Sequence, residues 1–331
     1  MTQDERYIKR CLELASNGLG RTRPNPMVGC VIVKEGRTVS EGYHQMIGEN
    51  HAERNAILRI CPELAEAGKT TQALKGATLY CNLEPCSHYG LTPPCAELIT
   101  RTGISRVVCC NDDPNPKVDG KGFKMLEAAG IEVVRHVMEA DGRWLNRRFF
   151  CQQEQHRPYI ILKWAESADH YMAPEGNAPY WISNPLAKQL SHKWRTEEAA
   201  ILIGSETYLA DRPQLNARLW SGNDPRPVGL DRRGRLADLP GHWLHLSHAT
   251  VEQAVEALQQ EHLQSVIVEG GRQILDAFLQ AGLWDEIRLL RGTPVYGSGV
   301  KAPVVDLKAA RVEHYRDNSV TYFFHPSVTL P

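Results

Sequence analysis

Four residues in the first third of the chain, His51, Glu53, Cys86 and Cys95, are of the types that build a catalytic zinc site. One imidazole and two thiolates supply three of the four ligands of zinc, which leaves the last position to the water that a hydrolytic zinc activates. Glu53 lies two residues after His51, so it can stay off the metal and carry protons between water and substrate. These residues therefore predict metal-assisted hydrolysis.

The order of these residues follows the H-x-E…P-C pattern of zinc deaminases, with Pro85 directly before Cys86. That pattern usually closes with C-x-x-C, whereas eight residues separate the two cysteines here. The intervening run ends in Pro93-Pro94 and predicts a loop that returns to the start of a helix at Cys95. Taken singly, each residue is better explained as a core histidine or a buried thiol, but in this order the set indicates hydrolytic deamination.

Length and composition predict a globular protein of more than one domain. The chain has 331 residues, of which 42% are hydrophobic and 23% charged, close to ordinary globular usage. A length of this size suggests about two domains of ~150 residues. We place the boundary near residue 150, where a polar, helix-like stretch from Glu139 to Gln155 gives way to a new strand, and expect domains of residues 1–150 and 151–331.

Charge and hydropathy argue against two classes of partner. The formal net charge is −1, and the densest basic pairs, Arg147-Arg148 and Arg232-Arg233, are better explained as solvated faces than as a nucleic-acid track. No apolar run approaches the ~18 residues that cross a bilayer, and the start of the chain does not resemble a signal peptide. We expect a cytoplasmic enzyme that binds neither nucleic acid nor membrane and, like many two-domain enzymes, forms a homo-oligomer.

Strand and helix patterns alternate along both halves, which predicts α/β sheets. In the first half we expect strands near residues 28–33, 38–43, 77–83, 106–110 and 131–134, and helices near 5–15, 51–61, 95–102 and 122–129. In the second half we expect strands near 159–165, 199–204, 265–269, 286–291 and 319–325, and helices near 185–196, 251–261 and 272–280. His51, Cys86 and Cys95 fall where strands end and helices begin, which is where ligand sites gather in such sheets.

Longer motifs extend this interpretation to a known family. The chain resembles the bifunctional pyrimidine deaminase/reductase of bacterial riboflavin biosynthesis in Pro24-Asn25-Pro26-Met27-Val28-Gly29, His51-Ala52-Glu53, Leu83-Glu84-Pro85-Cys86-Ser87-His88-Tyr89-Gly90-x-Thr92-Pro93-Pro94-Cys95 and Asp113-Pro114-Asn115-Pro116. The second half is similar to the reductase domain of that family in Lys163-Trp164-Ala165-x-Ser167-x-Asp169, Trp181-Ile182-Ser183, Leu209-Ala210-Asp211-x-Pro213-x-Leu215-x-x-Arg218 and Val268-Glu269-Gly270-Gly271. The long spacing between the cysteines is a specific mark of this family.

The resemblance implies a fold and a set of site residues. It implies an N-terminal cytidine-deaminase-like three-layer α/β/α domain and a C-terminal dihydrofolate-reductase-like α/β domain that uses NADPH. In the first domain it implies zinc on His51, Cys86 and Cys95, a proton shuttle at Glu53, and a substrate pocket lined by Asn25, His88, Asp113 and Asn115. In the second it implies substrate contacts at Lys163, Arg195, Leu215, Arg218 and Glu269, and cofactor contacts at Ala165, Trp181, Thr207, Asp211, Gly271, Arg272, Gln273, Ile274 and Leu275.

Physical arguments accompany some of these assignments. Gly270-Gly271 lies between a strand and a helix, so backbone amides could approach a phosphate, although plain turn chemistry explains such a pair as well. Arg195 and Arg218 could hold the substrate phosphate, if they are not simply surface arginines. Lys163 lies in an apolar strand, which favours a polar cavity, whereas a tryptophan such as Trp181 is usually a core residue.

Three departures from the family pattern in the second half leave an alternative open. His170 and Tyr171 replace a glycine and a basic residue, and Pro179 stands where the family often has serine. Position 91 is also changed, to leucine from a common lysine or arginine. These changes spare the metal site, so the alternative is a working deaminase joined to an impaired reductase.

The leading hypothesis is a bifunctional enzyme of riboflavin biosynthesis. The first domain would hydrolytically deaminate 2,5-diamino-6-ribosylamino-4(3H)-pyrimidinone 5′-phosphate, and the second would use NADPH to reduce the ribosyl chain to ribityl. Two rival hypotheses are a cytidine- or tRNA-type deaminase fused to an unrelated domain, and a non-catalytic zinc module. The cysteine spacing and near-zero charge disfavour the first, and Glu53 with a three-ligand set disfavours the second.

Overall fold

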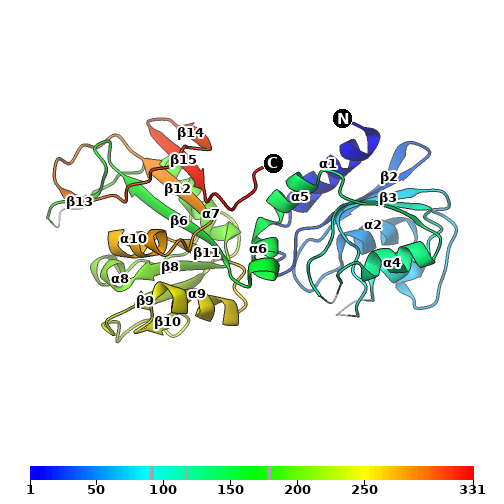
Figure 1. The fold of residues 1–331 in the computed structure, drawn as a ribbon, viewed down its shortest axis with the longest axis horizontal. Helices are drawn as coiled ribbons and strands as arrows, with labels where there is room; N and C mark the ends of the chain where they lie inside the picture. Colours follow the sequence, from blue (N-terminus) through cyan, green and yellow to red (C-terminus); the bar gives the residue numbers. More distant parts are fainter. Residues whose placement is uncertain (90–92, 117, 177–179) are drawn as a thin grey trace. The chain divides into compact units, whose positions relative to one another are not determined.

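The computed structural model describes residues 1–89, 93–116, 118–176 and 180–331 (Figure 1). These residues form two compact units, Met1–Gln155 with Thr329–Pro331, and His156–Val328. The division falls a few residues beyond position 150, after helix α6 (Arg147–Gln155). This helix belongs to the first unit because its Phe149 and Phe150 pack with Leu83.

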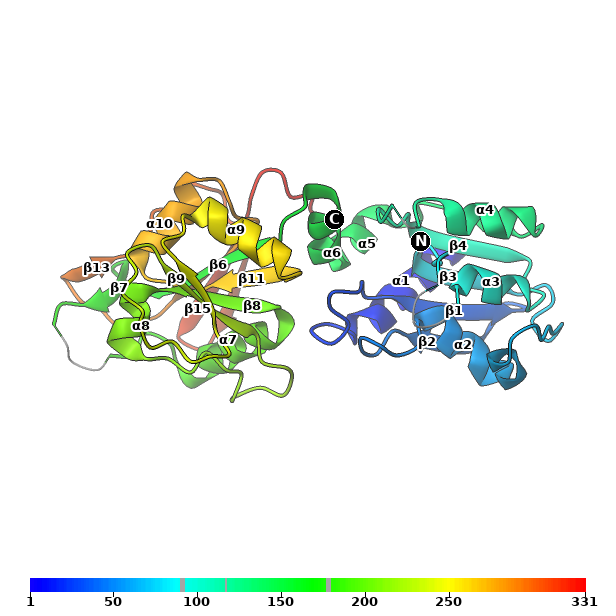
Figure 2. The same cartoon turned by 90° about the horizontal axis from the view of Figure 1, so that it is seen from below.

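The first unit is built on a five-stranded sheet in the order β2-β1-β3-β4-β5 (Figure 2). Strand β1 runs antiparallel to its neighbours β2 and β3, whereas β3, β4 and β5 are parallel. The strands span Gly29–Lys34 (β1), Arg37–Tyr43 (β2), Thr78–Leu83 (β3), Arg106–Asn111 (β4) and Glu132–Val134 (β5). The strands expected from the sequence are all present in this sheet.

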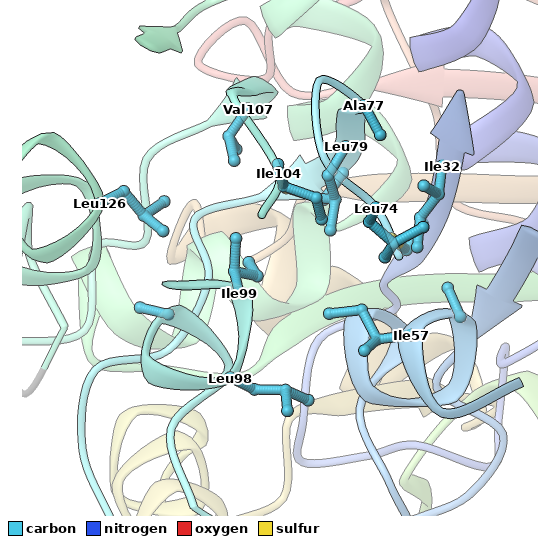
Figure 3. Packing of buried hydrophobic residues seen from close by; sticks show 14 of the residues in the cluster. Ile32, Ile57, Leu74, Ala77, Leu79, Leu98, Ile99, Ile104, Val107 and Leu126 are labelled. Atoms are coloured by element: carbon cyan, nitrogen blue, oxygen red, sulfur yellow. The ribbon is translucent and has the colours of Figure 1, made fainter. Parts of the chain in front are cut away.

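Helices cover both faces of this sheet, which gives three layers. Alternate strand residues face opposite sides: Ile32 joins a core with helices α2 (Ala52–Ile60), α3 (Cys95–Thr100) and α4 (Lys121–Ala128), whereas Val31 packs with α1 (Gln3–Ser16) and the start of α5. Because both faces of the interior strands are buried, β1, β3 and β4 are mostly apolar runs. Figure 3 shows part of the first core, with Ile57 of α2 and Leu98 of α3 near the strand residues.

The helix-like stretch expected over residues 139–155 is two helices in the structure. That stretch is divided into α5 (Glu139–Leu145) and α6, with Asn146 as the C-cap of α5. Asn146 lies between the two helices, and its buried side chain bonds to the backbone of Met27. A short 3-10 helix, Pro62–Ala65, follows α2.

The second unit contains an eight-stranded sheet in the order β10-β9-β8-β11-β6-β12-β15-β14. Its strands are β6 (Tyr159–Glu166), β8 (Ala200–Gly204), β9 (Arg226–Asp231), β10 (Leu244–Ser247), β11 (Ser265–Val268), β12 (Glu286–Arg291), β14 (Arg311–Tyr315) and β15 (Asn318–Phe324). The first six in the spatial order are parallel, and β15 and β14 close the sheet with antiparallel pairs. Strands β7 (Tyr171–Pro174) and β13 (Gly299–Lys301) form a separate pair.

Helices of the second unit place its candidate site residues at strand ends. Helices α9 (Val251–Gln260) and α10 (Arg272–Gln280) pack on one face of the sheet. Helix α7 (Pro185–Glu197) contacts the other face, where Trp194 lies edge-on to Tyr322 of β15. Helix α8 (Ser205–Asp211) begins directly where β8 ends. Among the residues that the structure describes, no helix has the length and apolar character needed to cross a bilayer.

Candidate active sites

Three ligand side chains converge in the first unit. His51 is the N-cap residue of α2, Cys86 follows the end of β3, and Cys95 is the first residue of α3. The His51 Nδ1 atom lies 3.5 Å from each of the two Sγ atoms, and the backbone N–H of Cys95 donates to the Cys86 Sγ at 3.3 Å. One ligand atom from each residue lies within 4.8 Å of the others.

The donor set fits zinc. Tetrahedral zinc, with Zn–S near 2.3 Å and Zn–N near 2.0 Å, places a nitrogen and a sulfur ligand about 3.5 Å apart. The observed nitrogen–sulfur distances are 3.5 Å. Hydrogen bonding with Cys95 and with His51 lowers the pKa of the Cys86 thiol, which favours the thiolate that a metal requires. His51, Cys86 and Cys95 could therefore hold a zinc ion with one position left open.

Glu53 is buried beside these ligands. It lies in the first turn of α2, its side chain is almost inaccessible, and it contacts Cys95. Burial, together with the nearby Cys86, raises the pKa of Glu53 to about 7. Gly42 of β2 allows this placement, since a Cβ atom there would lie 2.5 Å from the Ala52 carbonyl oxygen at the start of α2.

Asn25 lies next to a histidine that the sequence did not single out. The Asn25 Nδ2 atom is 3.3 Å from the Nε2 atom of His44, and the Nδ1 atom of His44 lies 3.1 Å from the Asn50 carbonyl oxygen. Because Nδ1 donates to that carbonyl, Nε2 is left as an acceptor for Asn25. The His44 ring is edge-on to the His51 ring at a centroid distance of 5.4 Å. His44 thus joins Asn25 to the metal ligand, and only its spacing before His51 could have suggested this.

A buried carboxylate supports the segment that carries Asp113 and Asn115. Glu84 accepts hydrogen bonds from the backbone N–H groups of Asp113, Gly120 and Gly122, at 3.4, 3.0 and 2.9 Å. Burial raises the pKa of Glu84, and these N–H groups oppose the shift. Asp113 is itself buried, which raises its pKa to about 7, and it accepts from the Asn115 N–H at 2.9 Å.

His88 is exposed, and positions 90–92 of its loop lie outside the described residues. The change at Leu91 is therefore not placed by the structure. The structure brings Asp113 and Asn115 together through their hydrogen bond, and it joins Asn25 to His51 through His44.

The second unit brings together three charged residues that are far apart in the sequence. The Glu269 carboxylate follows β11 and lies 2.7 Å from Arg195 Nη2 of α7 and 3.6 Å from Lys163 Nζ of β6. Burial lowers the pKa of Lys163, and Glu269 opposes that shift. Although burial acts against it, the two cations lower the pKa of Glu269 to about 2. The cluster keeps its carboxylate ionised at neutral pH.

Leu215 and Arg218 lie beside this cluster. Arg195 Nη1 donates to the carbonyl oxygen of Asn216 at 3.0 Å, and Arg218 donates to the Asn216 side chain at 3.0 Å. Leu215 is buried and has a positive φ of 56°, a conformation that is costly for a side chain of this size. Of the expected substrate contacts in this unit, all five are therefore near one another.

The sequence did not single out His192, which neighbours the same cluster. It is buried one helical turn before Arg195 on α7. Burial, with Arg195 and Arg218 adding to it, lowers the pKa of His192 to about 4, so the imidazole is neutral. Its three-residue offset from Arg195 is the signal in the sequence that could have identified it.

A cavity of about 980 Å³ opens at the ends of β8, β9 and β11. Five of the expected cofactor residues line it, Thr207, Gly271, Arg272, Gln273 and Ile274. Three arginines from the segment after β9 also line it, Arg232, Arg233 and Arg235. Gly271 is the N-cap of α10 and has no side-chain cap, so the first N–H groups of that helix are available to an anion.

The other expected cofactor residues do not line this cavity. Leu275 is fully buried in the core against α9, and Asp211 ends α8. Trp181 is 71% exposed and packs under the Lys188 ammonium at 4.0 Å, so it is not the core residue that its type suggests. Ala165 lies on β6.

Two of the three departures from the family pattern can be placed. His170 has a φ of 69°, in the left-handed region that favours glycine, and its Nδ1 lies 2.9 Å from the buried Glu166 carboxylate. Tyr171 begins β7 and donates from its hydroxyl to the Gly297 carbonyl at 3.1 Å. Pro179 lies outside the described residues. His170 and Tyr171 both make specific hydrogen bonds in a well-formed turn.

Two protein-family models match the chain, one in each unit. Residues 1–111 match the model described as "Cytidine and deoxycytidylate deaminase zinc-binding region", and residues 158–323 match that of the "RibD C-terminal domain". The fold and the sites thus define a zinc-type deaminase joined to a reductase that uses a nicotinamide cofactor.

Full-length relatives give the family. The chain is 35% identical to riboflavin biosynthesis protein RibD of Aquifex aeolicus over 90% of this chain and 89% of that protein. It is 36% identical to RibD of Escherichia coli over 90% of both. A diaminohydroxyphosphoribosylaminopyrimidine deaminase/5-amino-6-(5-phosphoribosylamino)uracil reductase from Thermotoga maritima superposes with a TM-score of 0.86 at 34% identity, covering 97% of this chain and 98% of that one.

The chain belongs to the RibD family of bifunctional deaminase/reductases of riboflavin biosynthesis. This confirms the family and the two-part α/β fold that the sequence motifs indicated. The alternative of an impaired reductase is not supported, since the match to the RibD C-terminal domain spans residues 158–323 and so includes His170 and Tyr171.

Proposed function

We propose that this chain catalyses two consecutive reactions on one small pyrimidine. The first unit hydrolytically deaminates 2,5-diamino-6-ribosylamino-4(3H)-pyrimidinone 5′-phosphate, and the second reduces the ribosyl chain of the product to ribityl with NADPH. The observation that carries the proposal is the convergence of His51, Cys86 and Cys95 within 4.8 Å beside the buried Glu53. Metal-assisted hydrolysis requires this combination of ligands and acid.

In the deaminase site, His51, Cys86 and Cys95 hold zinc. Bound zinc supplies an acidified water near neutral pH, so that hydrolysis needs no strong base. Glu53, held on the first turn of α2 and shielded from solvent, carries a proton to the pyrimidine ring nitrogen and then to the departing ammonia. Its two-residue offset from His51 keeps the carboxylate beside the ligands without making it one of them.

Polar residues around this centre hold the substrate. Asn25, with its Nδ2 atom committed to His44, presents its carbonyl oxygen to a donor on the pyrimidine. Asp113 and Asn115, on the segment anchored by Glu84, bind the ring and the ribose phosphate together with His88. These roles follow the resemblance, and the hydrogen bonds of Asn25 and Asp113 support them.

In the reductase site, Lys163, Arg195 and Glu269 contact the substrate, with Leu215 and Arg218 beside them. The substrate is an anion, and guanidinium groups such as those of Arg195 and Arg218 suit bidentate contact with phosphate. Lys163 is held within reach of Glu269, and its depressed pKa makes it a candidate proton donor as the sugar ring opens.

The cavity at the ends of β8, β9 and β11 holds the cofactor. Thr207 and the stretch from Gly271 to Ile274 contact it, with the pyrophosphate at the N-terminus of α10. Ala165, Trp181 and Asp211 would approach its nicotinamide part. The arginines that line the cavity supply the positive charge that NADPH, unlike NADH, requires for its 2′-phosphate. They support NADPH as the cofactor.

One experiment tests both activities. Purified zinc-loaded protein is given the diaminopyrimidine ribosylamine phosphate and NADPH, and ammonia release and oxidation of the nicotinamide are followed together. We expect one ammonia and one oxidised cofactor per substrate, with ammonia released first. Ammonia without cofactor oxidation would reject the reductase assignment, and ammonia from cytidine or RNA alone would reject the substrate.

Location and assembly complete the proposal. The near-neutral net charge and the absence, among the described helices, of one that could cross a bilayer support an enzyme that acts in the cytoplasm on a small molecule, without nucleic acid or membrane. We propose a homo-oligomer on the general tendency of such enzymes. Sedimentation of the purified chain tests it, and a monomer at micromolar concentration would reject it.

A further inference from the structure

The side chain of an asparagine from a distant segment forms two hydrogen bonds with the backbone of Met27. The Met27 N–H donates to Asn146 Oδ1 at 2.8 Å, and Asn146 Nδ2 donates back to the Met27 carbonyl oxygen at 2.9 Å. Such a reciprocal pair resembles the bonds that a residue exchanges with its neighbour in a β-sheet. Asn146 therefore provides Met27, which lies just before the start of β1, with the hydrogen bonds that a neighbouring strand would otherwise make.

A second asparagine side chain bonds to the same backbone segment. Asn82 of β3 accepts from the Gly29 N–H at 2.7 Å and donates to the Met27 carbonyl oxygen at 3.0 Å. Both asparagine side chains are buried, with 0% of Asn82 and 2% of Asn146 exposed. A buried amide fixes its partners strongly, since a broken bond leaves an unsatisfied polar group.

The backbone segment that Asn82 and Asn146 hold is next to a residue of the proposed pyrimidine pocket. Asn25 lies two residues before Met27, and the backbone N–H of His44 donates to the Val28 carbonyl at 2.8 Å. The same His44 ring contacts the Asn25 amide. A displacement of Met27 therefore moves Asn25 relative to His44 and His51.

We propose that Asn146 is a positioning residue of the deaminase: through Met27 it fixes the backbone that presents Asn25 to the pyrimidine. Asn146 lies beyond residue 111, where the match to the shared deaminase zinc-binding region ends, so the segment α5–α6 adds a part of the site. The inference rests on the pocket role of Asn25 proposed above.

The test variant is Asn146→Asp in the full, zinc-loaded chain. Aspartate keeps the shape and still accepts from the Met27 N–H, but it places a carboxylate oxygen against the Met27 carbonyl where a donor stood. We expect the KM for deamination to rise about tenfold to a hundredfold. Zinc content and the reductase rate on the already deaminated substrate are expected to stay unchanged, because neither depends on Met27.

The second unit offers a matched control. Asn318 of β15 is also a buried asparagine whose side chain bonds to the backbone of a segment outside any strand. It accepts from the Asn184 N–H at 2.6 Å and donates to the Ile182 carbonyl at 3.3 Å. Asn318→Asp makes the same chemical change and is expected to leave deamination unchanged. A loss of deamination in both variants would mean a general loss of stability and would overturn the proposal.

A double-mutant comparison separates positioning from simple stability. If Asn146 acts through Asn25, the effect of Asn146→Asp on the deamination KM should shrink in an Asn25→Ala background. An equal effect in both backgrounds overturns the proposal. An Asn25→Ala variant with normal KM rejects the pocket assignment and the inference together. A raised KM in Asn25→Ala with a normal KM in Asn146→Asp rejects the inference alone.

Should Asn146→Asp not fold, Asn146→Ser replaces it with the same expected outcomes, because serine removes the two bonds to Met27 without adding charge.

Discussion

The two candidate sites of this chain satisfy their polar groups in opposite ways. In the first unit, an imidazole nitrogen and two sulfurs, all electron-pair donors to a metal, lie within 4.8 Å of one another. In the second unit, the Glu269 carboxylate lies between the cations of Lys163 and Arg195. The first constellation is completed by a metal ion, whereas the second is balanced by residues of the chain itself.

This difference separates the requirements of the two activities. A chelator that removes zinc should stop deamination and spare reduction, since the reductase cluster contains no ligand of the metal. Conversely, breaking the charge balance of the second site should affect stability as well as rate, because its members depend on one another. The variants that follow test these consequences.

The largest effect is expected from Glu53→Gln. Glutamine keeps the size of the side chain but cannot carry a proton, so ammonia release should fall by about 10²–10⁴-fold. Zinc, bound by His51, Cys86 and Cys95, should remain at one ion per chain. The measurements are ammonia release and metal content, and reduction of the deaminated substrate in the same preparation is the control. Near-normal ammonia release would remove Glu53 from the mechanism.

The zinc constellation was predictable from the sequence, because its ligands lie in short motifs at fixed spacings. The interior strands β1, β3 and β4 of the first unit were equally predictable as apolar runs buried on both faces. Edge and short strands such as β7, β10, β13 and β14 were missed, because brief or exposed strands carry little hydrophobic pattern. The interior strand β9 was also missed, because Pro227 and Gly229 interrupt its apolar run. The break at Asn146 was missed because the partner of its side chain, the Met27 backbone, is distant in the sequence.

The reductase cluster was accessible only through family motifs. Glu269 and Arg195 are 74 residues apart, and no local pattern joins them. The register of the parallel pair β6–β11, in which Val268 lies opposite Leu162, brings Glu269 beside Lys163. Strand register depends on the whole sheet, so composition and spacing alone could not supply it.

Glu269→Gln is expected to have the next largest effect. It leaves Lys163 and Arg195 buried without their counter-charge, which should cost about 3 kcal/mol of unfolding free energy and abolish most reduction. Zinc content and deamination of the folded protein should be retained. The measurements are denaturant unfolding at pH 7 and the two rates, and Glu261→Gln, a change at an exposed glutamate of the same unit, is the matched control.

The pH dependence sharpens this prediction. Arg195 and Lys163 lower the folded pKa of Glu269 to about 2, below the usual value of 4.5. Its contribution to stability is therefore fully present above pH 4.5 and is lost as pH falls toward 2. The difference in unfolding free energy between the native chain and Glu269→Gln should shrink over that range. A constant difference between pH 5 and pH 3 would contradict the ionised, paired carboxylate.

A smaller effect is expected in the cofactor cavity. Replacing Arg232 and Arg233 with glutamine removes two positive charges from the wall, and the KM for NADPH should rise about tenfold as charge-assisted contacts to its 2′-phosphate are lost. The KM for NADH, which has no such phosphate, should not change. Arg212→Gln, at a surface arginine paired with Asp238, is the control. An equal rise for both cofactors would place these arginines away from the 2′-phosphate.

The smallest effect is expected at His170, and it bears on whether the turn of the second unit is damaged or merely different. A histidine in the left-handed region is strained by about 1–2 kcal/mol, whereas its exposed pair with Glu166 contributes less than about 1 kcal/mol. Glu166 also keeps its bonds to Arg291 and Trp164. His170→Gly should therefore stabilise the chain by about 0.5–1 kcal/mol, after allowance for the freer unfolded backbone, and leave reduction unchanged.

The comparison with His170→Ala isolates the backbone contribution, because alanine loses the same pair with Glu166 but keeps the strained φ. Denaturant unfolding should rank glycine above histidine and histidine above alanine. If instead glycine raised the reductase rate severalfold, His170 would be limiting catalysis, and the second unit would be the weaker half of the enzyme. If the stability order is as expected and the reductase rate is unchanged, His170 imposes a backbone strain that its pair with Glu166 partly offsets. The two units then differ in how their charged groups are balanced, and both are active.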